Sequence, residues 1–373
     1  MKKVLFVATV VKMHIEVFHL PYLKWFKENG YEVHVCAKND YENKKDCNIP
    51  YCDKFVDLPF ERSPFKINNI KVYKQLKKVI ETNNYDIIHC HTPMGGVLTR
   101  LAGKNVRKNK TKLIYTAHGF HFYRGGPLRN WLLYYPVEKL LSQYTDVLIT
   151  INKEDFNYAK SFKPLKLSYV PGVGVDVKKF NNSNDVDRDK KRRELGVKSN
   201  EVALLSVGEL SKRKNHEVVI RALAELDDPN IIYLVCGQGD LDEYLENLAG
   251  KLRVNIRFLG FRKDIYEICA ASDIFLFPSY QEGLPVALME AMSAGLPVVC
   301  SQIRGNTDLI ENGTGGFLVH PGDISGFKEN IEILANDNPL RKKMGLNNKK
   351  SVKKYDKEVV ERSMESIYRE LLK

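Results

Sequence analysis

Two glutamates, Glu282 and Glu290, lie eight residues apart where an apolar stretch gives way to a helical pattern. Pro285 suits the first turn of that helix, because the N–H it lacks would have no partner there. Backbone amides at a helix N-terminus attract phosphate through free N–H groups and the helix dipole. We therefore expect a sugar nucleotide here, with Glu282 accepting from the transferred sugar and Glu290 from the ribose. The diphosphate would lie over Gly283 and Leu284, although an ordinary strand–turn–helix with an acidic start has the same spacing.

A second segment, residues 207–217, combines the end of a strand, a turn at Gly208, a basic loop and the start of a helix. The loop contains three consecutive cations, Lys212, Arg213 and Lys214. Cations that follow the carboxyl end of a strand can neutralise a departing diphosphate without a metal ion. The alternative is a solvated basic loop that caps the next helix.

Histidines mark the ends of two predicted strands in the first half. His118 follows a buried strand directly and precedes Gly119. It is expected to exchange a hydrogen bond with a sugar hydroxyl, and a loop histidine satisfied by its neighbours is the alternative. His89 and His91 alternate on another strand, which puts both rings on one face. No third ligand with recognised spacing accompanies this pair, so the sequence predicts no metal centre.

The elements that must position these side chains alternate as strand and helix along the first half of the chain. Parallel sheets bury both faces, so their strands are continuously apolar. The first half shows this rhythm at residues 4–10, 18–29, 32–37, 70–82, 86–90, 95–104, 112–116 and 146–151.

A second series of the same kind begins after the charged residues 181–194. It includes strands or helices at 202–208, 217–226, 231–237, 240–251, 256–259, 274–278, 285–293, 297–300 and 316–319. Gly and Pro punctuate residues 171–180, where the charge balance also changes, so a domain boundary is expected there. We predict an α/β protein with two doubly wound domains in tandem.

Residues 357–373 form a tail with a helical pattern. Val360, Met364, Ile367 and Leu371 recur at helical spacing with charges between them. An amphipathic helix of this kind needs an apolar surface to cover.

The composition argues against several classes of protein. With 373 residues, 43% of them hydrophobic and 28% charged, the chain is unlike disordered, collagen-like or coiled-coil proteins. Neither Gly-x-Gly-x-x-Gly after the first strand nor Gly-x4-Gly-Lys-Ser/Thr occurs, which argues against a nicotinamide dehydrogenase and a P-loop kinase. Seven scattered Cys are unlike a secreted disulfide framework, so a reducing cytoplasm is expected.

Charge is divided unequally between the two halves. Residues 1–172 carry 28 Lys and Arg against 15 Asp and Glu, net +13, whereas residues 173–373 carry 30 against 31, net −1. A one-sided positive field suits an anionic partner such as lipid headgroups or a lipid-linked phosphate, and a basic face that serves solubility is the alternative. Nucleic acid is not expected, because no zinc finger, RNP-type strand or basic recognition helix is visible.

Four motifs of the second half resemble those of glycosyltransferase family 4, the retaining GT-B enzymes, and occur in the family's order. They are Val-Gly-Glu-Leu-Ser-Lys-Arg-Lys-Asn (207–215), Val-Cys-Gly-Gln-Gly (235–239), Phe-Leu-Gly-Phe-Arg (258–262) and Pro-Ser-Tyr-Gln-Glu-Gly-Leu-Pro (278–285). The first half resembles the bacterial exopolysaccharide and capsule subgroup. Its motifs are Phe-His-Leu-Pro-Tyr-Leu-Lys (18–24), His-Cys-His-Thr-Pro-Met-Gly-Gly (89–96) and Thr-Ala-His-Gly-Phe-His-Phe-Tyr (116–123).

By position, the resemblance implies roles for individual residues. Glu282 would contact the donor sugar together with His118, Lys214 would contact the diphosphate, and Glu290 the ribose. The backbone near Phe261 and Arg262 would hold the base. The implied catalytic residues are thus His118, Lys214 and Glu282. The implied donor-binding residues are Gly208, Arg213, Lys214, Phe261, Arg262, Glu282, Gly283, Leu284 and Glu290.

Two departures from the family's pattern qualify these roles. Many members have Arg directly after the strand glycine, where this chain has Glu209, and Arg213 is the candidate to take over the phosphate contact. The first loop, residues 9–15, lacks the Gly-Gly often found there.

The resemblance implies a GT-B fold in which two Rossmann-like domains face a cleft. We expect an acceptor-binding domain at 1–172, a nucleotide-sugar-binding domain at 173–355, and a helix at 356–373 that crosses back to the first domain. The function implied is a retaining hexosyl- or N-acetylhexosaminyltransferase that uses a nucleotide-diphosphate donor, a UDP-sugar above all, and needs no metal or other cofactor.

Its acceptor would be a lipid-linked saccharide in extracellular or capsular polysaccharide synthesis. The protein is expected in the cytoplasm, on the anionic inner face of the cell membrane. Two alternatives stay open: a GT-B sugar-nucleotide epimerase and a non-catalytic module that binds sugar nucleotides.

Overall fold

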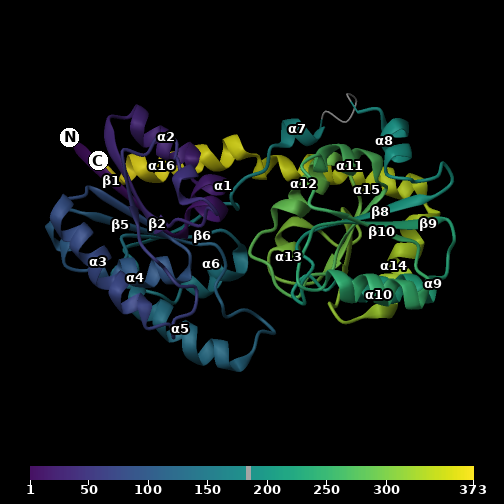
Figure 1. Ribbon diagram of the computed structural model, residues 1–373, viewed down its shortest axis with the longest axis horizontal. Coiled ribbons are helices and arrows are strands. Elements are labelled where there is room, and N and C mark those ends of the chain that lie inside the picture. Colours follow the sequence, from purple (N-terminus) through teal and green to yellow (C-terminus); the bar gives the residue numbers. More distant parts are fainter. Residues whose placement is uncertain (182–185) are drawn as a thin grey trace. The chain divides into compact units, whose positions relative to one another are not determined.

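The computed structural model describes residues 1–181 and 186–373, and the chain divides into two units (Figure 1). Unit 1 comprises Met1–Val173 with Val360–Lys373, and unit 2 comprises Gly174–Val359. Each unit is built around one sheet whose described strand pairs are all parallel. The two tandem α/β sheets predicted from the rhythm of the sequence are confirmed.

The sheet of unit 1 has the strand order β3-β2-β1-β4-β5-β6-β7. Its strands are β1 (Lys2–Val10), β2 (Tyr31–Lys38), β3 (Lys54–Asp57), β4 (Ile87–His91), β5 (Lys112–Ala117), β6 (Val147–Thr150) and β7 (Lys166–Tyr169). In β1 every residue from Val4 to Thr9 is buried, because helices cover both faces of the sheet.

Helices cover the two faces of this sheet in two groups. The described helices are η1 (Val11–Ile15), α1 (Glu16–Phe18), α2 (Leu20–Glu28), η2 (Lys44–Asp46), α3 (Asn68–Asn83), α4 (Pro93–Gly103), η3 (Val106–Asn109), α5 (Leu128–Ser142), α6 (Lys153–Ala159) and α16 (Lys357–Leu371). One core joins the sheet to α2 and α16, and a second joins the opposite face to α3 and α4.

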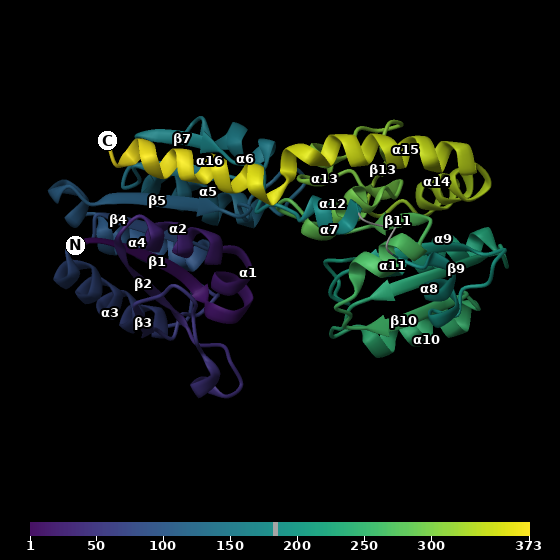
Figure 2. The ribbon, with the colours of Figure 1, turned by 90° about the horizontal axis from the view of Figure 1, so that it is seen from above.

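Helix α16 returns from the far end of the sequence to complete the core of unit 1, where it lies beside α2 (Figure 2). Val360, Met364 and Ile367 are buried there, and Leu371 is partly buried against the same core. Tyr368 is fully buried, with its ring centroid 5.5 Å from that of Trp25. The core of unit 1 is therefore the apolar surface that the amphipathic tail, as predicted from the sequence, covers.

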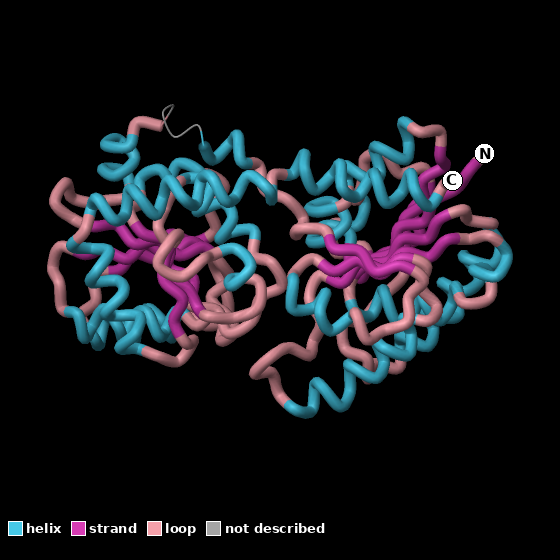
Figure 3. The backbone as a smooth tube through the Cα atoms, turned by 180° about the vertical axis from the view of Figure 1, so that it is seen from behind, coloured by secondary structure: helices cyan, strands magenta, loops and turns pink. Residues whose placement is uncertain are grey.

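The sheet of unit 2 has the order β10-β9-β8-β11-β12-β13. Figure 3 shows the strands of each unit in magenta, with cyan helices around them. Its strands are β8 (Val202–Val207), β9 (Ile231–Cys236), β10 (Ile256–Gly260), β11 (Ile274–Phe277), β12 (Val298–Ser301) and β13 (Gly316–Val319). Its described helices are α7 (Val177–Asn181), α8 (Arg188–Glu194), α9 (His216–Leu226), α10 (Asp242–Leu252), α11 (Ile265–Ala271), α12 (Val286–Ala294), α13 (Asn306–Leu309), α14 (Ile324–Asn336), α15 (Asn338–Ser351) and η5 (Val352–Tyr355).

Each sheet has a point where the strand order reverses, between β1 and β4 in unit 1 and between β8 and β11 in unit 2. In open parallel sheets, ligands bind outside the carboxyl ends of the strands at such a point. The loops that follow these four strands are therefore where a ligand site is expected. Within the described residues, the chain has no helix of the length and apolarity that a bilayer crossing requires.

Candidate functional site

In unit 2, the loops after β8 and β11 bring two cations onto one carboxylate. Lys214 donates from Nζ to Oε1 of Glu282 at 2.8 Å, and Arg213 donates from Nη1 to the same oxygen at 2.9 Å. The Lys214 and Glu282 side chains are 12% and 10% exposed, whereas Arg213 is 43% exposed. Three of the residues predicted from separate motifs thus meet at the point where the strand order reverses.

The backbone around Lys214 is fixed by its neighbour. Asn215 has a left-handed backbone (φ 55°), and its Nδ2 donates to the carbonyl oxygens of Pro278 at 3.1 Å and Pro321 at 2.8 Å. The Lys214 ammonium lies 4.5 Å from the centroid of the Phe277 ring. Burial lowers the pKa of Lys214 and outweighs the opposing effect of Glu282. The ammonium is therefore held in place and poorly hydrated, which strengthens its pull on an anion.

Two glycines allow the surrounding loops to pack closely. A Cβ on Gly237, which follows β9, would overlap the carbonyl oxygen of Gly208. A Cβ on Gly305 would overlap the carbonyl oxygen of Gly283. The backbone at Gly208 and Gly283, both predicted to lie near the donor, is thus braced by other backbone rather than by side chains.

Helix α12 begins at Val286, with Pro285 as its N-cap at φ −77°. The prediction that Pro285 lies in the first turn is therefore wrong by one position, because the residue still has extended backbone (ψ 123°). Gly283 and Leu284 precede this N-cap, and Leu284 is buried at 6% exposure. The amino end of α12 follows Glu282 in the chain after Gly283, Leu284 and Pro285.

Glu290 lies on α12 but in different surroundings from Glu282. Burial raises the pKa of Glu290 to about 7, and the charge of Lys179 on α7 works in the opposite direction. The charge of Glu290 in turn helps to raise the pKa of the Cys269 thiol on α11, which burial raises most. A carboxyl group that gives up its proton near neutrality can change its hydrogen-bonding role there.

The residues expected near the base follow β10. Phe261 is 70% exposed. Arg262 donates to both carboxylate oxygens of Asp264 at 2.8 and 2.6 Å and to Glu194 at 3.3 Å. The Arg262 guanidinium is thus occupied by carboxylates, which raise its pKa. Only the backbone of this segment fits the predicted role.

Arg213 is also close to the residue that departs from the family's pattern. Its Nη2 lies 3.7 Å from Oε2 of Glu209, and its Nη1 donates to the carbonyl oxygen of Gln281 at 3.2 Å. Arg213 therefore links the loop after β8 with the loop after β11, which places a guanidinium in the region where the family has its arginine.

In unit 1, His118 is one of four clustered histidines. His14 in η1, His19 before α2, His91 at the end of β4 and His118 after β5 each have a ring nitrogen within 4.8 Å of the others. His118 and His91 are joined between Nε2 and Nδ1 at 3.4 Å. Burial lowers the pKa of His118 to about 4, so its imidazole is neutral.

The sequence motifs do not identify His14 and His19 as partners of His118. The available signal is topological: β1, β4 and β5 are neighbours in the sheet, so residues just beyond their carboxyl ends must lie close together. His89 shares a face with His91, as predicted, with ring centroids 4.0 Å apart. Both ring nitrogens of His89 are already bonded, to Tyr368 at 2.9 Å and to Thr116 at 2.8 Å.

Thr92, between β4 and α4, has a strained backbone. Its φ is 62°, which is rare for a β-branched residue. Its hydroxyl oxygen lies 2.6 Å from that of Thr9, and Thr9 also donates its backbone N–H to it at 3.2 Å. Such strain persists where surrounding contacts enforce it, often at functional sites. Here it fixes the chain directly after His91.

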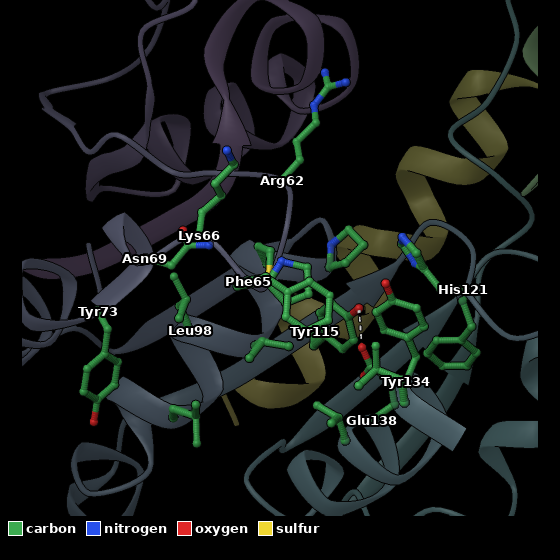
Figure 4. Close-up of a pocket in the computed structure, with 18 of the residues that line it drawn as sticks. Arg62, Phe65, Lys66, Asn69, Tyr73, Leu98, Tyr115, His121, Tyr134 and Glu138 are labelled. Carbon is green, nitrogen blue, oxygen red and sulfur yellow. Dashed lines mark hydrogen bonds between the residues drawn. The ribbon is translucent and has the colours of Figure 1, made fainter. Parts of the chain in front are cut away.

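A pocket of ≈ 540 Å³ opens beside this cluster in unit 1 (Figure 4). Its walls come from the segment before α3 and from α4, α5 and the loop after β5. Figure 4 shows Arg62 and Lys66 on one side and His121 and Tyr134 on the other. Most of the remaining lining is apolar, including Leu98. A pocket of this size and lining suits a largely apolar ligand with a charged end.

Large apolar side chains are exposed around the pocket. On α5, Leu128, Leu132 and Leu140 are 73%, 72% and 62% exposed. Before α3, Phe65 and Ile67 are 77% and 83% exposed. Soluble surfaces rarely gather apolar residues of this size, and such gatherings mark contacts with proteins or membranes. The sequence pattern predicts no helix at α5.

Comparisons with known proteins agree with the motifs. Residues 3–152 match the family described as glycosyl transferase 4-like, and residues 187–351 match glycosyl transferases group 1. EpsD of Bacillus subtilis (strain 168), whose name gives glycosyltransferase as a provisional activity, is 40% identical over 373 residues, 98% of this chain and 96% of its own. The UDP-Gal:alpha-D-GlcNAc-diphosphoundecaprenol alpha-1,3-galactosyltransferase of Escherichia coli is 31% identical over 293 residues, 74% of this chain and 75% of its own.

A solved structure shares the whole architecture. The crystal structure of Anabaena Alr3699/HepE in complex with UDP and glucose has a TM-score of 0.79 and 21% identity, and the match covers 99% of this chain and 100% of that one. The predicted GT-B fold, with two Rossmann-like halves, is confirmed.

Proposed function

Because the chain belongs to glycosyltransferase family 4, we propose that it transfers a sugar, with retained anomeric configuration, from a UDP-sugar to a lipid-linked saccharide. The product would be an intermediate of extracellular or capsular polysaccharide. The observation that carries the proposal is the convergence of Lys214, Arg213 and Glu282 where the strand order of unit 2 reverses. A sugar nucleotide presents a diphosphate to cations and sugar hydroxyls to a carboxylate, so this arrangement matches both ends of one ligand.

Departure of the diphosphate is the step that needs stabilisation. We assign it to Lys214 and Arg213 together with the amino end of α12, where the amides of Gly283 and Leu284 precede the helix. Positive charge fixed in a poorly hydrated site stabilises a developing anion without reorganisation. These groups supply the charge that a divalent ion would otherwise provide, so the proposed transfer is metal-independent.

Two carboxylates would orient the rest of the donor. We assign Glu282 to hydroxyls of the transferred sugar and Glu290 to the ribose, with the backbone of Phe261 and Arg262 along the base. His118 of unit 1 is assigned to the donor sugar. Support for a UDP-sugar comes from the Escherichia coli relative, whose name specifies UDP-Gal.

The acceptor is assigned to unit 1. The pocket of ≈ 540 Å³ has apolar walls and cationic side chains at Arg62 and Lys66. An isoprenoid diphosphate matches this pocket, because its chain is apolar like the walls and its anionic head complements the cationic side chains. The name of the Escherichia coli relative specifies a diphosphoundecaprenol acceptor, which supports this class.

Unit 1 would also hold the enzyme at the inner face of the cell membrane. The net charge of +13 over residues 1–172 favours anionic headgroups. Exposed Leu128, Leu132 and Leu140 on α5, with Phe65 and Ile67, offer apolar side chains for insertion beside the pocket. The two features together suit a protein that takes its acceptor from a bilayer.

The full chain can be tested with UDP-Gal, UDP-Glc, UDP-GlcNAc, UDP-GalNAc and a GDP-sugar, with and without undecaprenyl-diphosphate-linked GlcNAc, in EDTA. We expect UDP release and a new lipid-linked disaccharide with one UDP-sugar, and an α-anomeric product by NMR. Conversion of the UDP-sugar without acceptor would indicate an epimerase. Donor binding without any turnover across acceptors would indicate a binding module. Transfer that disappears in EDTA and returns with magnesium would contradict the metal-independent step.

A further inference from the structure

The histidine cluster of unit 1 has the composition of a metal site. Its four imidazoles, from His14, His19, His91 and His118, bring one nitrogen each within 4.8 Å of all the others. Imidazole nitrogen is a favoured ligand of zinc and of neighbouring divalent transition metals. Zinc binds imidazole nitrogen at about 2.0–2.1 Å, so a tetrahedral set needs its nitrogens roughly 3.4 Å apart. The most distant pair of nitrogens, within 4.8 Å of each other, therefore has to approach by at most about 1.4 Å to reach that geometry.

Unused nitrogens in the cluster form a second and independent observation. His19 and His91 are 2% and 1% exposed. Within the described part of the chain, both nitrogens of His19, Nε2 of His91 and Nε2 of His14 have no hydrogen-bond partner. Buried polar groups are nearly always paired, and an exception calls for a missing partner. Of the four clustered imidazoles, those of His14, His19 and His91 have an unpaired nitrogen, and a cation is the simplest partner that they could share with His118.

His89 shows what a purely structural histidine looks like in the same place. It lies two residues before His91 on β4 and is fully buried. Its nitrogens are bonded to the hydroxyls of Tyr368 at 2.9 Å and Thr116 at 2.8 Å. The difference between these two neighbours is therefore in their bonding rather than in their burial.

We propose that His14, His19, His91 and His118 bind one zinc ion. One consequence rests on the proposed function, in which His118 contacts the donor sugar: zinc would draw His118 away from the sugar. Zinc then inhibits transfer, whereas the transfer itself needs no metal. All four ligands of this inhibitory site belong to unit 1.

Binding can be measured without any turnover. We expect the metal-stripped full chain to bind one zinc ion by calorimetry, and Co²⁺ to give the intense visible absorption of a tetrahedral nitrogen site. His19→Gln and His91→Gln should each weaken zinc binding at least about tenfold, since even losses in the outer shell of a zinc site cost that much. His89→Gln, the matched control from the same strand, should leave the affinity unchanged.

Three outcomes would overturn the proposal. The first is the absence of saturable zinc binding, and the second is unchanged affinity in both His19→Gln and His91→Gln. The third is loss of binding in a Cys47→Ser, Cys52→Ser double variant, because these two thiols are partly accessible, whereas Cys36 and Cys90 of unit 1 are buried. Thermal denaturation of every variant separates a lost site from a lost fold.

Activity then tests the consequence separately. Zinc should inhibit transfer by the natural chain, and the zinc concentration for half inhibition should rise at least about tenfold in His19→Gln, in step with the loss of affinity. Zinc binding without inhibition would remove the consequence but keep the site. Absence of glycosyl transfer with intact zinc binding would contradict the proposed function alone.

Discussion

Lys214 and Arg213 both donate to Oε1 of Glu282, at 2.8 and 2.9 Å. One carboxylate oxygen thus neutralises two neighbouring cations when no diphosphate is present. A donor that brings its own negative charge competes with Glu282 for these cations and frees the carboxylate to accept from sugar hydroxyls. Without a donor, the contact therefore neutralises the two cations and holds their side chains at the place where the diphosphate would bind.

Lys214→Ala should lower kcat about 100-fold, because it removes a buried cation from the departing diphosphate. Arg213→Ala should lower kcat about tenfold, since its side chain is 43% exposed and better screened. Lys212→Ala is the matched control, an exposed cation of the same loop, and should change kcat less than about twofold. Steady-state kinetics with saturating donor checks all three. Equal effects at Lys212 and Lys214 would contradict the assignment.

The affinity for donor should rise with pH across neutrality. Burial raises the pKa of Glu290 to about 7, so this carboxyl is mostly protonated at pH 6 and mostly ionised at pH 8. The ionised form makes the stronger, charge-assisted hydrogen bonds to the ribose hydroxyls, so binding favours the state that dominates above the pKa. The Kd for UDP should fall roughly tenfold from pH 6 to pH 8.

Calorimetry with UDP at several pH values measures this dependence. Glu290→Gln should bind UDP more weakly at pH 8 and show a flat profile, whereas Glu311→Gln, at an exposed position of unit 2, should keep the natural profile. A profile that stays unchanged in Glu290→Gln would assign the titration to another group.

Vesicle binding should depend on the exposed leucines of α5. Replacing Leu128, Leu132 and Leu140 by Ser removes three apolar side chains from the insertion surface and should weaken binding to phosphatidylglycerol-containing vesicles at least about tenfold. Leu165→Ser with Leu346→Ser is the control, because these leucines are 74% and 69% exposed but lie outside α5. Cosedimentation measures the effect, and equal losses in both variants would remove the assignment of α5.

Charge reversal tests the electrostatic part of membrane binding. Lys104→Glu, Lys108→Glu and Lys112→Glu together should weaken vesicle binding at low ionic strength and have less effect at high salt, since screening reduces surface electrostatics. Binding that is unchanged at low salt would show that the positive charge of this part of unit 1 does not face lipid.

Glu138→Ala should destabilise unit 1 by about 3–5 kcal/mol. Glu138 on α5 pairs with Arg100 on α4 at 2.8 Å, and Arg100 is fully buried over the ring of Tyr115. Removing the carboxylate leaves that guanidinium without its counter-charge. Lys139→Ala, the exposed neighbour, should change stability by less than about 0.5 kcal/mol. Urea unfolding followed by tryptophan fluorescence reports unit 1, because Trp25 and Trp131 both lie in it.

The sequence predicts most of the architecture because parallel strands carry a strong signal. A continuous apolar run such as 4–10 in β1 is typical of a strand that is buried on both faces. Lys214 and Glu282 could be placed at one site because each follows a strand near a glycine turn, and β8 and β11 are neighbours. In this region, the sequence motifs and the strand order therefore predict the same site.

Helix α5 and strand β3 escaped prediction for related reasons. The apolar residues of α5 face solvent as well as the core, and Pro136 interrupts its pattern, so it has no clear amphipathic period. Strand β3 has only four residues, Lys54–Asp57, and none of them is fully buried. Neither element shows the contrast between buried and exposed positions on which sequence patterns depend.

The histidine cluster shows a different limit. His14 and His118 are separated by more than a hundred residues and come together only because β1, β4 and β5 end at one edge. A search for metal ligands at regular spacing cannot find such a set. The strand order is the missing information.

Helix α16 has a consequence for biosynthesis. Residues 360–373 fill the core of unit 1, and Tyr368 holds the His89 side chain there. On the ribosome, all the strands of unit 2 emerge before this segment, so the domain that is translated first is the one that is finished last. Until Tyr368 has been synthesised, Tyr22, Trp25 and Phe26 of α2 lack the aromatic ring that packs against them in the finished protein.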